Sequence, residues 1–320
     1  MSEKLKVGIV GIGGISGVHV PAWLEMEDVK VLGICDIRPE QMDKYPGVPH
    51  FTDYEKMLSS ADFDIIDICL PTPLHVDYAV KAMNRGINVI TEKPISLREE
   101  DVDRAYTAAE KNGVLFMVAQ CVRFMQPYAL VKEYYDSKKY GKLLSGSMWR
   151  LGNAPRWSWD DWMLDEKRSG FIPYDLHIHD LDYMVYAFGK PEKCTVNRAK
   201  APDQDYLSAV YEYDGFFIHA ESSWYKEAYP FQSGFRFQFE DALVVSDRGV
   251  FEVYEKDGIR KPLEDNVQTG SMLLSDNSYA NELRYFADAV KAGTPIEKVR
   301  PEELSAVIRI LNSFPGTLER

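Results

Sequence analysis

Hydrophobic residues in the N-terminal third of the chain occur in short, nearly continuous Val/Ile/Leu runs. Runs of this kind are typical of strands buried on both faces of a parallel sheet. The pattern predicts five such strands and a weaker sixth, at Lys6–Gly11, Lys30–Asp36, Asp64–Leu70, Ile87–Thr91 and Val114–Cys121, with the weaker one at Val48–Phe51.

Amphipathic stretches separate these runs, at Ile15–Met26, Tyr54–Ser59, His75–Asn84 and Glu99–Lys111. Gly86 and Gly113 follow the last two, and a glycine just past the last turn is a common helix stop. Alternating strands and helices predict an α/β fold in which a doubly wound parallel sheet is joined by right-handed crossovers.

The pattern changes after Arg123. Helices are expected at Pro127–Ser137 and Asp175–Phe188, on either side of a tryptophan-rich stretch of turns from Trp149 to Gly170. Strands with alternating faces follow and indicate a mainly antiparallel sheet, at Leu207–Tyr213, Phe216–Trp224, Phe235–Glu240 and Leu243–Asp247. Two helices, Tyr279–Ala292 and Glu302–Asn312, are expected after the sheet.

Composition limits the classes of partner. The formal net charge is −13, from 37 Lys and Arg against 50 Asp and Glu, and this balance argues against binding to nucleic acid or to an anionic membrane surface. No run approaches the roughly 20 apolar residues of a membrane helix. The four cysteines lack the spacing of metal or redox motifs. We therefore expect a cytoplasmic protein with buried free thiols and no metal.

A glycine loop, Gly11-Ile12-Gly13-Gly14-Ile15-Ser16, lies between the first predicted strand and helix. The first glycine permits a tight turn, the second lets the backbone approach a pyrophosphate, and the helix N-terminus favours its charge. Asp36, at the end of the second strand, completes the fingerprint of a dinucleotide site. Residues 1–122 are thus predicted to form a Rossmann domain and residues 123–320 a second α/β domain.

Asp36 is expected to accept hydrogen bonds from the adenosine ribose hydroxyls, which favours NAD. Arg38 complicates this, because its guanidinium could face a 2′-phosphate, so NADP is the alternative. Pro71 and Thr72 form a turn that we expect beside the nicotinamide together with His75. The equal alternative is a plain turn followed by a surface histidine.

Glu92-Lys93-Pro94 follows the fifth predicted strand. Ligands of doubly wound sheets bind at the carboxyl ends of the strands. Lys93 is therefore expected to meet a substrate and the cofactor, with Glu92 beside the cofactor.

The segment Asp175 to Asp182 allows two interpretations. As a strand, it would place His177 and His179 on one face, like a metal-binding pair. As a helix, it would place Asp175 and His179 one turn apart, where a carboxylate orients an imidazole and raises its basicity. The helix is favoured because apolar residues recur at helical spacing, at Leu181, Met184, Val185 and Phe188. A purely structural pair remains an alternative.

Weaker candidates for contact with a substrate surround this segment. Arg123 has two equal alternatives: it binds a hydroxyl or carboxylate of the substrate, or it forms a structural ion pair. Trp162, in the tryptophan-rich stretch, offers an aromatic face that suits a sugar ring but also suits core packing. Tyr174 could line the pocket.

Three motifs together resemble one family: Gly11 to Ser16, Glu92-Lys93-Pro94, and Gly170 to His179, supported by Arg123-Phe124, Glu282 to Phe286 and Arg300-Pro301-Glu302. The chain resembles the glucose–fructose oxidoreductase, inositol dehydrogenase and MocA (Gfo/Idh/MocA) family along nearly its whole length. The resemblance implies an N-terminal Rossmann domain and a C-terminal α/β domain with an open antiparallel sheet. It also implies NAD(P)-dependent oxidation or reduction of sugars, cyclitols or related polyols, by homodimers or homotetramers joined through that sheet.

By the same resemblance, Lys93, Asp175 and His179 are the catalytic residues, and the peptide before Pro94 is cis. His179 would take the hydroxyl proton as hydride leaves, and Lys93 would stabilise the oxygen. This chain has His177 where the family usually has glycine; it either adds a polar group near the substrate or faces the sheet. Two other functions remain as alternatives: an NAD-dependent glycosidase that oxidises its substrate transiently, and a non-catalytic regulator that senses the cofactor.

Overall fold

The computed structural model describes residues 3–263 and 278–316. The chain divides into two compact units, Met1–Cys121 with Tyr279–Leu304, and Val122–Ser278 with Ser305–Arg320. The first segment ends close to the boundary expected at residue 122. The helix near residue 280, expected in the second domain, lies mostly in the first unit.

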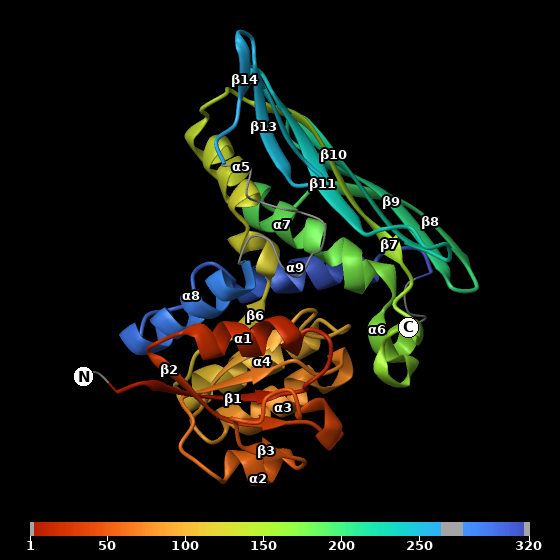
Figure 1. Cartoon of the computed structure of the whole chain (residues 1–320). Coiled ribbons are helices and arrows are strands. Elements are labelled where there is room, and N and C mark those ends of the chain that lie inside the picture. The colour runs from red at the N-terminus through yellow and green to blue at the C-terminus, as the bar shows by residue number, and fades with distance from the viewer. Residues whose placement is uncertain (1–2, 264–277, 317–320) are drawn as a thin grey trace. The chain divides into compact units, whose positions relative to one another are not determined.

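A six-stranded parallel sheet forms the centre of the first unit, in the order β3-β2-β1-β4-β5-β6 (Figure 1). This is the strand order of a dinucleotide-binding Rossmann fold, and it confirms the doubly wound sheet. The strands are β1 (Leu5–Val10), β2 (Val29–Cys35), β3 (His50–Phe51), β4 (Ile65–Ile68), β5 (Asn88–Glu92) and β6 (Phe116–Ala119). Every residue of β4 and β6 is buried, as the continuous apolar runs predict.

The helices of the first unit begin and end within about two residues of the predicted positions. The side chain of Asp53 accepts a hydrogen bond from the Lys56 amide and caps one of them, and Gly113 ends another with a left-handed φ of 64°. The helices are α1 (Ser16–Glu25), α2 (Tyr54–Leu58), α3 (His75–Met83) and α4 (Glu100–Asn112), with the short 3-10 turns η1 (Pro39–Gln41) and η2 (Thr72–Leu74).

Helix α8 (Ser278–Ala292) lies beside α1 in the first unit (Figure 1). The Tyr279 and His19 rings are 5.8 Å apart, and Arg284 Nη1 is 2.7 Å from Asp28 Oδ1. Lys291 pairs with the second oxygen of Asp28. These contacts join residues more than two hundred positions apart, so no local pattern could assign the helix to this unit.

An eight-stranded sheet forms the second unit, in the order β14-β13-β12-β11-β7-β10-β9-β8. Its neighbours are antiparallel except for β7 and β10, which run parallel. The mainly antiparallel sheet is thus confirmed. Its strands are β7 (Leu143–Asn153), β8 (Lys193–Ala201), β9 (Gln204–Tyr213), β10 (Phe216–Tyr225), β11 (Gln232–Phe239), β12 (Ala242–Asp247), β13 (Val250–Glu255) and β14 (Gly258–Arg260).

Strand β7 is central to this sheet, although the sequence pattern does not predict it. The strand is rich in Ser and Gly, and it includes Trp149, which we expected to begin a stretch of turns. The inward-facing Gly146 explains part of the weak signal. A Cβ there would lie 2.7 Å from the Phe237 ring and 3.1 Å from Ile218, so neighbouring strands supply the apolar atoms that β7 lacks.

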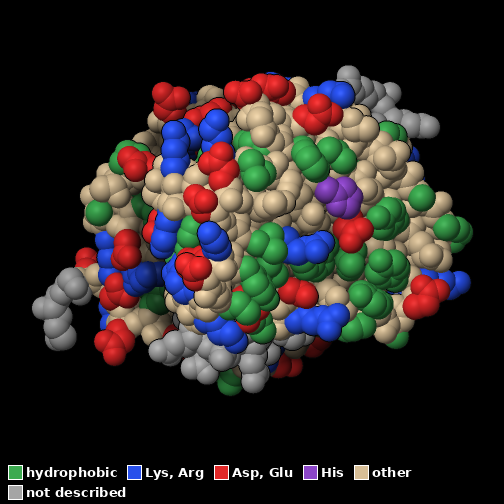
Figure 2. Space-filling model, turned by 90° about the horizontal axis from the view of Figure 1, so that it is seen from above, with side chains coloured by type: hydrophobic (Ala, Val, Ile, Leu, Met, Phe, Trp, Pro, Cys, Tyr) green, Lys and Arg blue, Asp and Glu red, His purple; other side chains and the backbone are tan. Residues whose placement is uncertain are grey.

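The two faces of this sheet differ. Helices α5 (Gln126–Ser137) and α7 (Ile178–Phe188) cover one face (Figure 1). There the Tyr128 and Phe235 ring centroids are 4.8 Å apart, and those of Phe188 and Phe237 are 5.5 Å apart. Viewed from above, the space-filling surface shows hydrophobic side chains in patches among acidic and basic ones (Figure 2). The exposed large hydrophobic residues on the strands include Leu144, Tyr206, Phe217, Leu243, Val250, Tyr254 and Ile259.

The remaining elements are η3 (Cys121–Phe124), η4 (Trp159–Leu164), α6 (Glu166–Ser169), the π-helical turn η5 (Pro173–His177) and α9 (Pro301–Asn312). Within the part of the chain that the structure describes, none of the helices combines the length and the apolar character that a membrane span requires.

The contact between Asp28 and α8 generates a prediction. The hydrogen bond from Lys291, supported by Arg284, lowers the pKa of Asp28 to about 2 against the opposing effect of burial. Asp28→Asn should lower the free energy of unfolding at pH 7 by about 0.5–1 kcal/mol, because the pair is partly exposed and screened by solvent. Since the folded-state pKa is depressed, this difference should vanish as the pH falls from about 4 toward 2. Urea denaturation measures it.

The matched control is Glu27→Gln, one residue earlier on the same exposed surface, which should leave the free energy of unfolding unchanged. Equal stabilities of the Asp28 variant and the wild-type protein at pH 7 would contradict the role of Asp28 in holding α8.

Candidate active site

The glycine loop of the first unit turns directly from β1 into α1. Gly11 has a φ of +89°, and a Cβ there would lie 2.5 Å from the Cys69 carbonyl oxygen, so no larger residue fits. A Cβ on Gly13 would meet nothing within 4 Å, so open space lies against this backbone. The Ser16 hydroxyl donates to the Gly13 carbonyl over 2.8 Å. A pyrophosphate can therefore approach the N-terminus of α1, which favours its negative charge.

Asp36 joins this loop to the end of β2. Its Oδ2 accepts a 2.8 Å hydrogen bond from the Ile12 amide, and its Oδ1 accepts one of 2.8 Å from the Arg38 amide. Arg38 Nε lies 3.3 Å from the same Oδ1. A carboxylate has about four acceptor positions, so Asp36 can still accept from ribose hydroxyls. These residues fit NAD.

The turn after β4 carries a buried histidine. His75 is 1% exposed, so the surface alternative is wrong. Its Nδ1 lies 2.8 Å from the Pro94 carbonyl oxygen and its Nε2 lies 2.6 Å from that of Leu70; burial lowers its pKa. Pro71 and Thr72 precede it, and Thr72 is buried. His75 thus links the end of β4 to the turn that follows β5.

Lys93 begins that second turn. The Lys93–Pro94 peptide is cis, as the family resemblance implies. The Lys93 amide donates to Glu92 Oε2 over 3.0 Å, and Glu92 is only 7% exposed. The backbone that carries Lys93 is therefore held on one side by Glu92 and on the other, at Pro94, by His75.

A polar network that was not predicted from the sequence lies behind Glu92. His19 Nδ1 and Trp23 Nε1 each lie 2.8 Å from Asp67 Oδ2, and His19 Nε2 lies 3.0 Å from Glu92 Oε1. One signal was available: Asp67 interrupts the apolar run of β4 and is 0% exposed. A buried carboxylate needs hydrogen-bond donors, but the sequence does not show which residues supply them.

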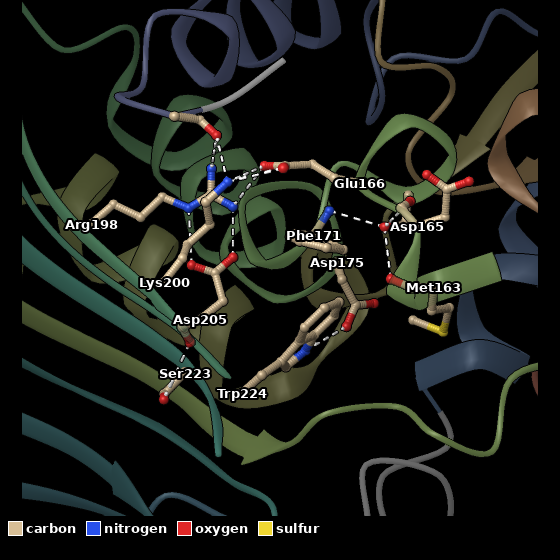
Figure 3. Close-up of polar contacts among 12 residues, drawn as sticks. Met163, Asp165, Glu166, Phe171, Asp175, Arg198, Lys200, Asp205, Ser223 and Trp224 are labelled. Carbon is tan, nitrogen blue, oxygen red and sulfur yellow. Dashed lines mark hydrogen bonds and ion pairs between the residues drawn. The ribbon is translucent and has the colours of Figure 1, made fainter. Parts of the chain in front are cut away.

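In the second unit, Asp175 lies in the π-helical turn η5 and His179 in the first turn of α7. The helical interpretation is confirmed, and with it the strand-based metal pair of His177 and His179 is excluded. Trp224 Nε1 donates to Asp175 Oδ2 over 3.2 Å (Figure 3). Asp175 is half-buried, and His179 is 1% exposed. Single π turns occur frequently at functional sites.

The chain leading to this turn is fixed by local geometry. Gly170 has a φ of +74°, and a Cβ there would lie 2.3 Å from the Tyr174 ring. The Phe171 amide donates to the Ser169 hydroxyl over 3.0 Å. Arg198 bridges Asp205 at 2.6 Å and Glu166 at 3.3 Å (Figure 3). Helix α6, which precedes this turn, is therefore attached through Glu166 to strands β8 and β9.

His177 faces the sheet, which is the second of its two alternatives. It is 0% exposed, with Nδ1 3.0 Å from the Ser222 hydroxyl and Nε2 2.6 Å from the Tyr211 hydroxyl. Burial, with a smaller effect of the Arg150 charge, lowers its pKa to about 3. Because both ring nitrogens are engaged inside the unit, the predicted role of His177 in substrate binding is corrected to packing.

Two further substrate candidates are also internal. Arg123 is 1% exposed and forms a bidentate pair with Asp182, at 2.7 and 2.6 Å, which is the structural ion pair of the two alternatives. Tyr174 is 0% exposed and donates to Asn312 Oδ1 over 2.7 Å, so it does not present its hydroxyl to a substrate. Trp162 is half-buried in η4, and its contact with a substrate stays a prediction.

Both units of this architecture match models of known protein families. Residues 5–120 match the family model "Oxidoreductase family, NAD-binding Rossmann fold", and residues 128–245 match the "GFO/IDH/MocA C-terminal domain". Inositol 2-dehydrogenase of Salmonella typhimurium is 27% identical over 198 residues, 59% of this chain and 56% of that enzyme. D-glucoside 3-dehydrogenase of Escherichia coli is 25% identical over 201 residues, 61% of this chain and 57% of that enzyme.

Solved structures share the fold. An oxidoreductase from Agrobacterium radiobacter, in complex with NAD+, L-tartaric acid and magnesium, has a TM-score of 0.83 at 18% identity, covering 97% of this chain and 95% of that one. Levoglucosan dehydrogenase with NADH and L-sorbose has a TM-score of 0.81 at 18% identity, with the same coverage of 97% and 95%. Matched in both units, this chain belongs to the Gfo/Idh/MocA family of oxidoreductases, with the family's NAD-binding Rossmann domain as its first unit.

Proposed function

We propose that this protein is an NAD-dependent dehydrogenase or reductase that transfers hydride to or from a secondary alcohol or ketone carbon of a sugar, cyclitol or related polyol. The observation that carries the proposal is the position of Lys93. It follows β5 at the carboxyl end of an NAD-binding sheet, on a backbone held by Glu92 and His75. The relatives named inositol 2-dehydrogenase and D-glucoside 3-dehydrogenase support the substrate class.

When bound, NAD supplies the carbon that accepts or donates the hydride. The Gly11–Ser16 loop would hold its pyrophosphate and Asp36 its adenosine ribose. Lys93 hydrogen-bonds the substrate oxygen and stabilises its developing negative charge. His179 takes the hydroxyl proton as general base. Asp175, fixed by Trp224, orients His179 or hydrogen-bonds a neighbouring hydroxyl.

In this proposal His75 does not contact the reacting atoms but acts through the backbone that carries Lys93. Rates depend steeply on the placement of catalytic groups, and a shift of about 1 Å can cost a hundredfold. By donating a hydrogen bond from Nδ1 to the Pro94 carbonyl oxygen, His75 keeps the turn that carries Lys93 in place. In this proposal His75 is a positioning residue, and its contact with the cofactor stays a prediction.

The proposal includes a homodimer or homotetramer joined through the second sheet, in the cytoplasm. Phe217, 50% exposed on β10, and the other exposed hydrophobic residues of the strands support the interface, because aromatic and other apolar residues are enriched at the core of subunit interfaces. All four cysteines are free thiols, which suits a reducing compartment.

Removal of the catalytic groups provides the direct test. Lys93→Met and His179→Ala should each lower kcat by about 10²- to 10⁴-fold, the usual contribution of acid–base catalysis, while NADH affinity stays within about twofold. Spectrophotometric assays of NAD reduction over a panel of inositols, glycosides and sugars, in parallel with NADH fluorescence titration, measure both quantities.

Lys30→Met and His50→Ala, at exposed positions of the same unit, are the matched controls and should be neutral. Normal turnover by both catalytic variants would contradict the proposed roles. Release of an aglycone without net NADH would favour the glycosidase, and NAD binding without turnover of any compound would favour the regulator.

The positioning role of His75 has a separate test. A neutral imidazole donates one hydrogen bond, so His75→Ala leaves the buried Pro94 carbonyl without this donor. It should lower the free energy of unfolding by about 1–3 kcal/mol and lower kcat by at least about tenfold. His50, which contacts the Tyr45 carbonyl at the surface, provides the control: His50→Ala should change each quantity far less. Urea denaturation measures the stability of both variants, and steady-state kinetics measure their kcat. Indistinguishable effects of the two substitutions would rule out the positioning role of His75.

The sheet interface predicts the effect of a charge at its surface. Phe217→Glu should lower the mass measured by light scattering coupled to size-exclusion chromatography, since an unpaired buried charge disfavours association. Leu24→Glu, at a comparably exposed apolar position on α1 (49%), should leave the mass unchanged. A wild-type protein that runs as a monomer would refute the interface.

A further inference from the structure

Four ionisable side chains form a buried cluster in the first unit: His19 from α1, Asp67 from β4, Glu92 from β5 and Glu282 from α8. His19, Asp67 and Glu282 are 0% exposed and Glu92 is 7% exposed. Three of the four are acids, so the arrangement of protons within the cluster decides whether it can be buried at all.

The hydrogen-bond donors fix part of that arrangement. An indole N–H only donates, so Asp67 Oδ2 accepts from Trp23 Nε1 over 2.8 Å. His19 Nδ1 is 2.8 Å from the same oxygen and donates to it as well. On the other side of the imidazole, Glu92 Oε2 accepts from the Lys93 amide, and Glu92 Oε1 lies 3.0 Å from His19 Nε2.

A ring that lies between two carboxylates in this way is best satisfied as an imidazolium, with a proton on each nitrogen. Burial is the largest single effect and acts to lower the pKa of His19, but the opposing effects of Asp67 and Cys69 together outweigh it, and the pKa lies well above its ordinary value. One positive charge therefore lies between the two negative charges of Asp67 and Glu92, which leaves none to compensate a third carboxylate.

Glu282 is that third carboxyl group. Among the described residues, neither of its oxygens has a hydrogen-bond partner, yet an oxygen of Glu282, an oxygen of Glu92 and a nitrogen of His19 all lie within 4.8 Å of one another. An ionised group here would be unpaired and desolvated, at a cost of several kcal/mol. Burial, reinforced by the charge of Glu92, raises the pKa of Glu282 well above its ordinary value.

Among the described residues, the other groups around the cluster add no positive charge to it. The Tyr279 ring lies 5.8 Å from the His19 ring, and the Cys69 thiol lies 3.7 Å from Asp67 Oδ1. Burial raises the pKa of the Cys69 thiol to about 12 and that of Tyr279 well above its ordinary value, so both stay neutral. Cys121, which interacts with Tyr279, is buried too.

We propose that Glu282 is a proton-carrying positioning residue: held neutral, it leaves His19 paired with Glu92, and Glu92 in turn holds the backbone of Lys93. Loss of its proton would place a second negative charge beside Glu92, compete for His19 and loosen the hold of Glu92 on the Lys93 amide. The effect on turnover rests on the proposed function; the protonation of Glu282 does not.

The first experiment tests protonation alone, by urea denaturation of the full chain from about pH 5.5 to 8.5 for the wild-type protein and Glu282→Gln. A native Glu282 keeps its proton where the unfolded chain, with a pKa near 4.3, has lost it. The native state then binds more protons, so wild-type stability falls as the pH rises toward the folded-state pKa. Glutamine does not ionise, so the stability of Glu282→Gln lacks this dependence on pH.

The unfolding constant of the wild-type protein, divided by that of Glu282→Gln, should therefore rise by up to about tenfold for each pH unit in this window. Glu110→Gln, at an exposed position on α4, should give a ratio independent of pH. A constant ratio for Glu282→Gln would overturn the proposal. If Glu282→Gln does not fold, Glu282→Met, neutral and of similar length, replaces it in the same measurement.

The second experiment tests positioning. With the substrate identified by the panel assay, Glu282→Gln should retain kcat within about threefold at pH 7, since it remains neutral, and its kcat should decline at a pH about one unit higher than in the wild-type protein. The KM for NAD should not change. An alkaline decline at the same pH in both proteins would overturn the positioning role.

The two outcomes separate this inference from the proposed function, because a protein without dehydrogenase activity can still show the pH-dependent unfolding ratio.

Metal analysis of the purified protein adds a further check. A stoichiometric divalent cation that is lost in Glu282→Gln would overturn the proposal, since a bound cation would require Glu282 to be ionised.

Discussion

The turn from Glu92 to Pro94 is held by hydrogen bonds of Glu92 and His75, and the proposed chemistry depends on that constraint. A strand end in a parallel sheet is anchored by its ladder on one side only; beyond it, the backbone must find other partners. Here Glu92 accepts from the Lys93 amide, while His75 engages the Pro94 carbonyl. Lysine has a flexible side chain, so a fixed backbone is what limits the positions that its ammonium group can reach.

Buried charge has a different arrangement in each unit. In the second unit, Arg123, Arg150 and Arg198 each face an aspartate, Asp182, Asp180 and Asp205 respectively, at 2.6 to 2.9 Å. Such pairs add little net stability but impose a specific geometry, since breaking either partner leaves an unpaired charge. In the first unit, His19 lies between two carboxylates, and the net charge of the cluster depends on the protons of His19 and Glu282 rather than on an arginine. The first unit is therefore the one whose packing should respond to pH.

The sequence predicted what local patterns encode. The Rossmann strands are continuous apolar runs, the glycine loop lies between a strand and a helix, and apolar spacing after Asp175 distinguishes a helix from a strand. Strand β7 escaped prediction because its neighbours, such as Phe237, provide the apolar surface against Gly146. The network of His19, Asp67 and Glu282 escaped because its members meet only after strands and helices far apart in sequence have packed.

Three residues predicted to contact the substrate are buried, and this limits where substrate specificity can arise. Arg123, Tyr174 and His177 were selected for side chains that bind hydroxyl groups, yet each is buried and engaged within its own unit. Polar chemistry alone does not distinguish a residue that binds a ligand from one that packs a core, because buried polar groups must also be satisfied. Trp157 and Trp159, 72% and 44% exposed, keep aromatic surface that suits the apolar face of a sugar ring. If the proposed function holds, discrimination between polyols is thus better sought in the segment that carries these tryptophans than in helix α7.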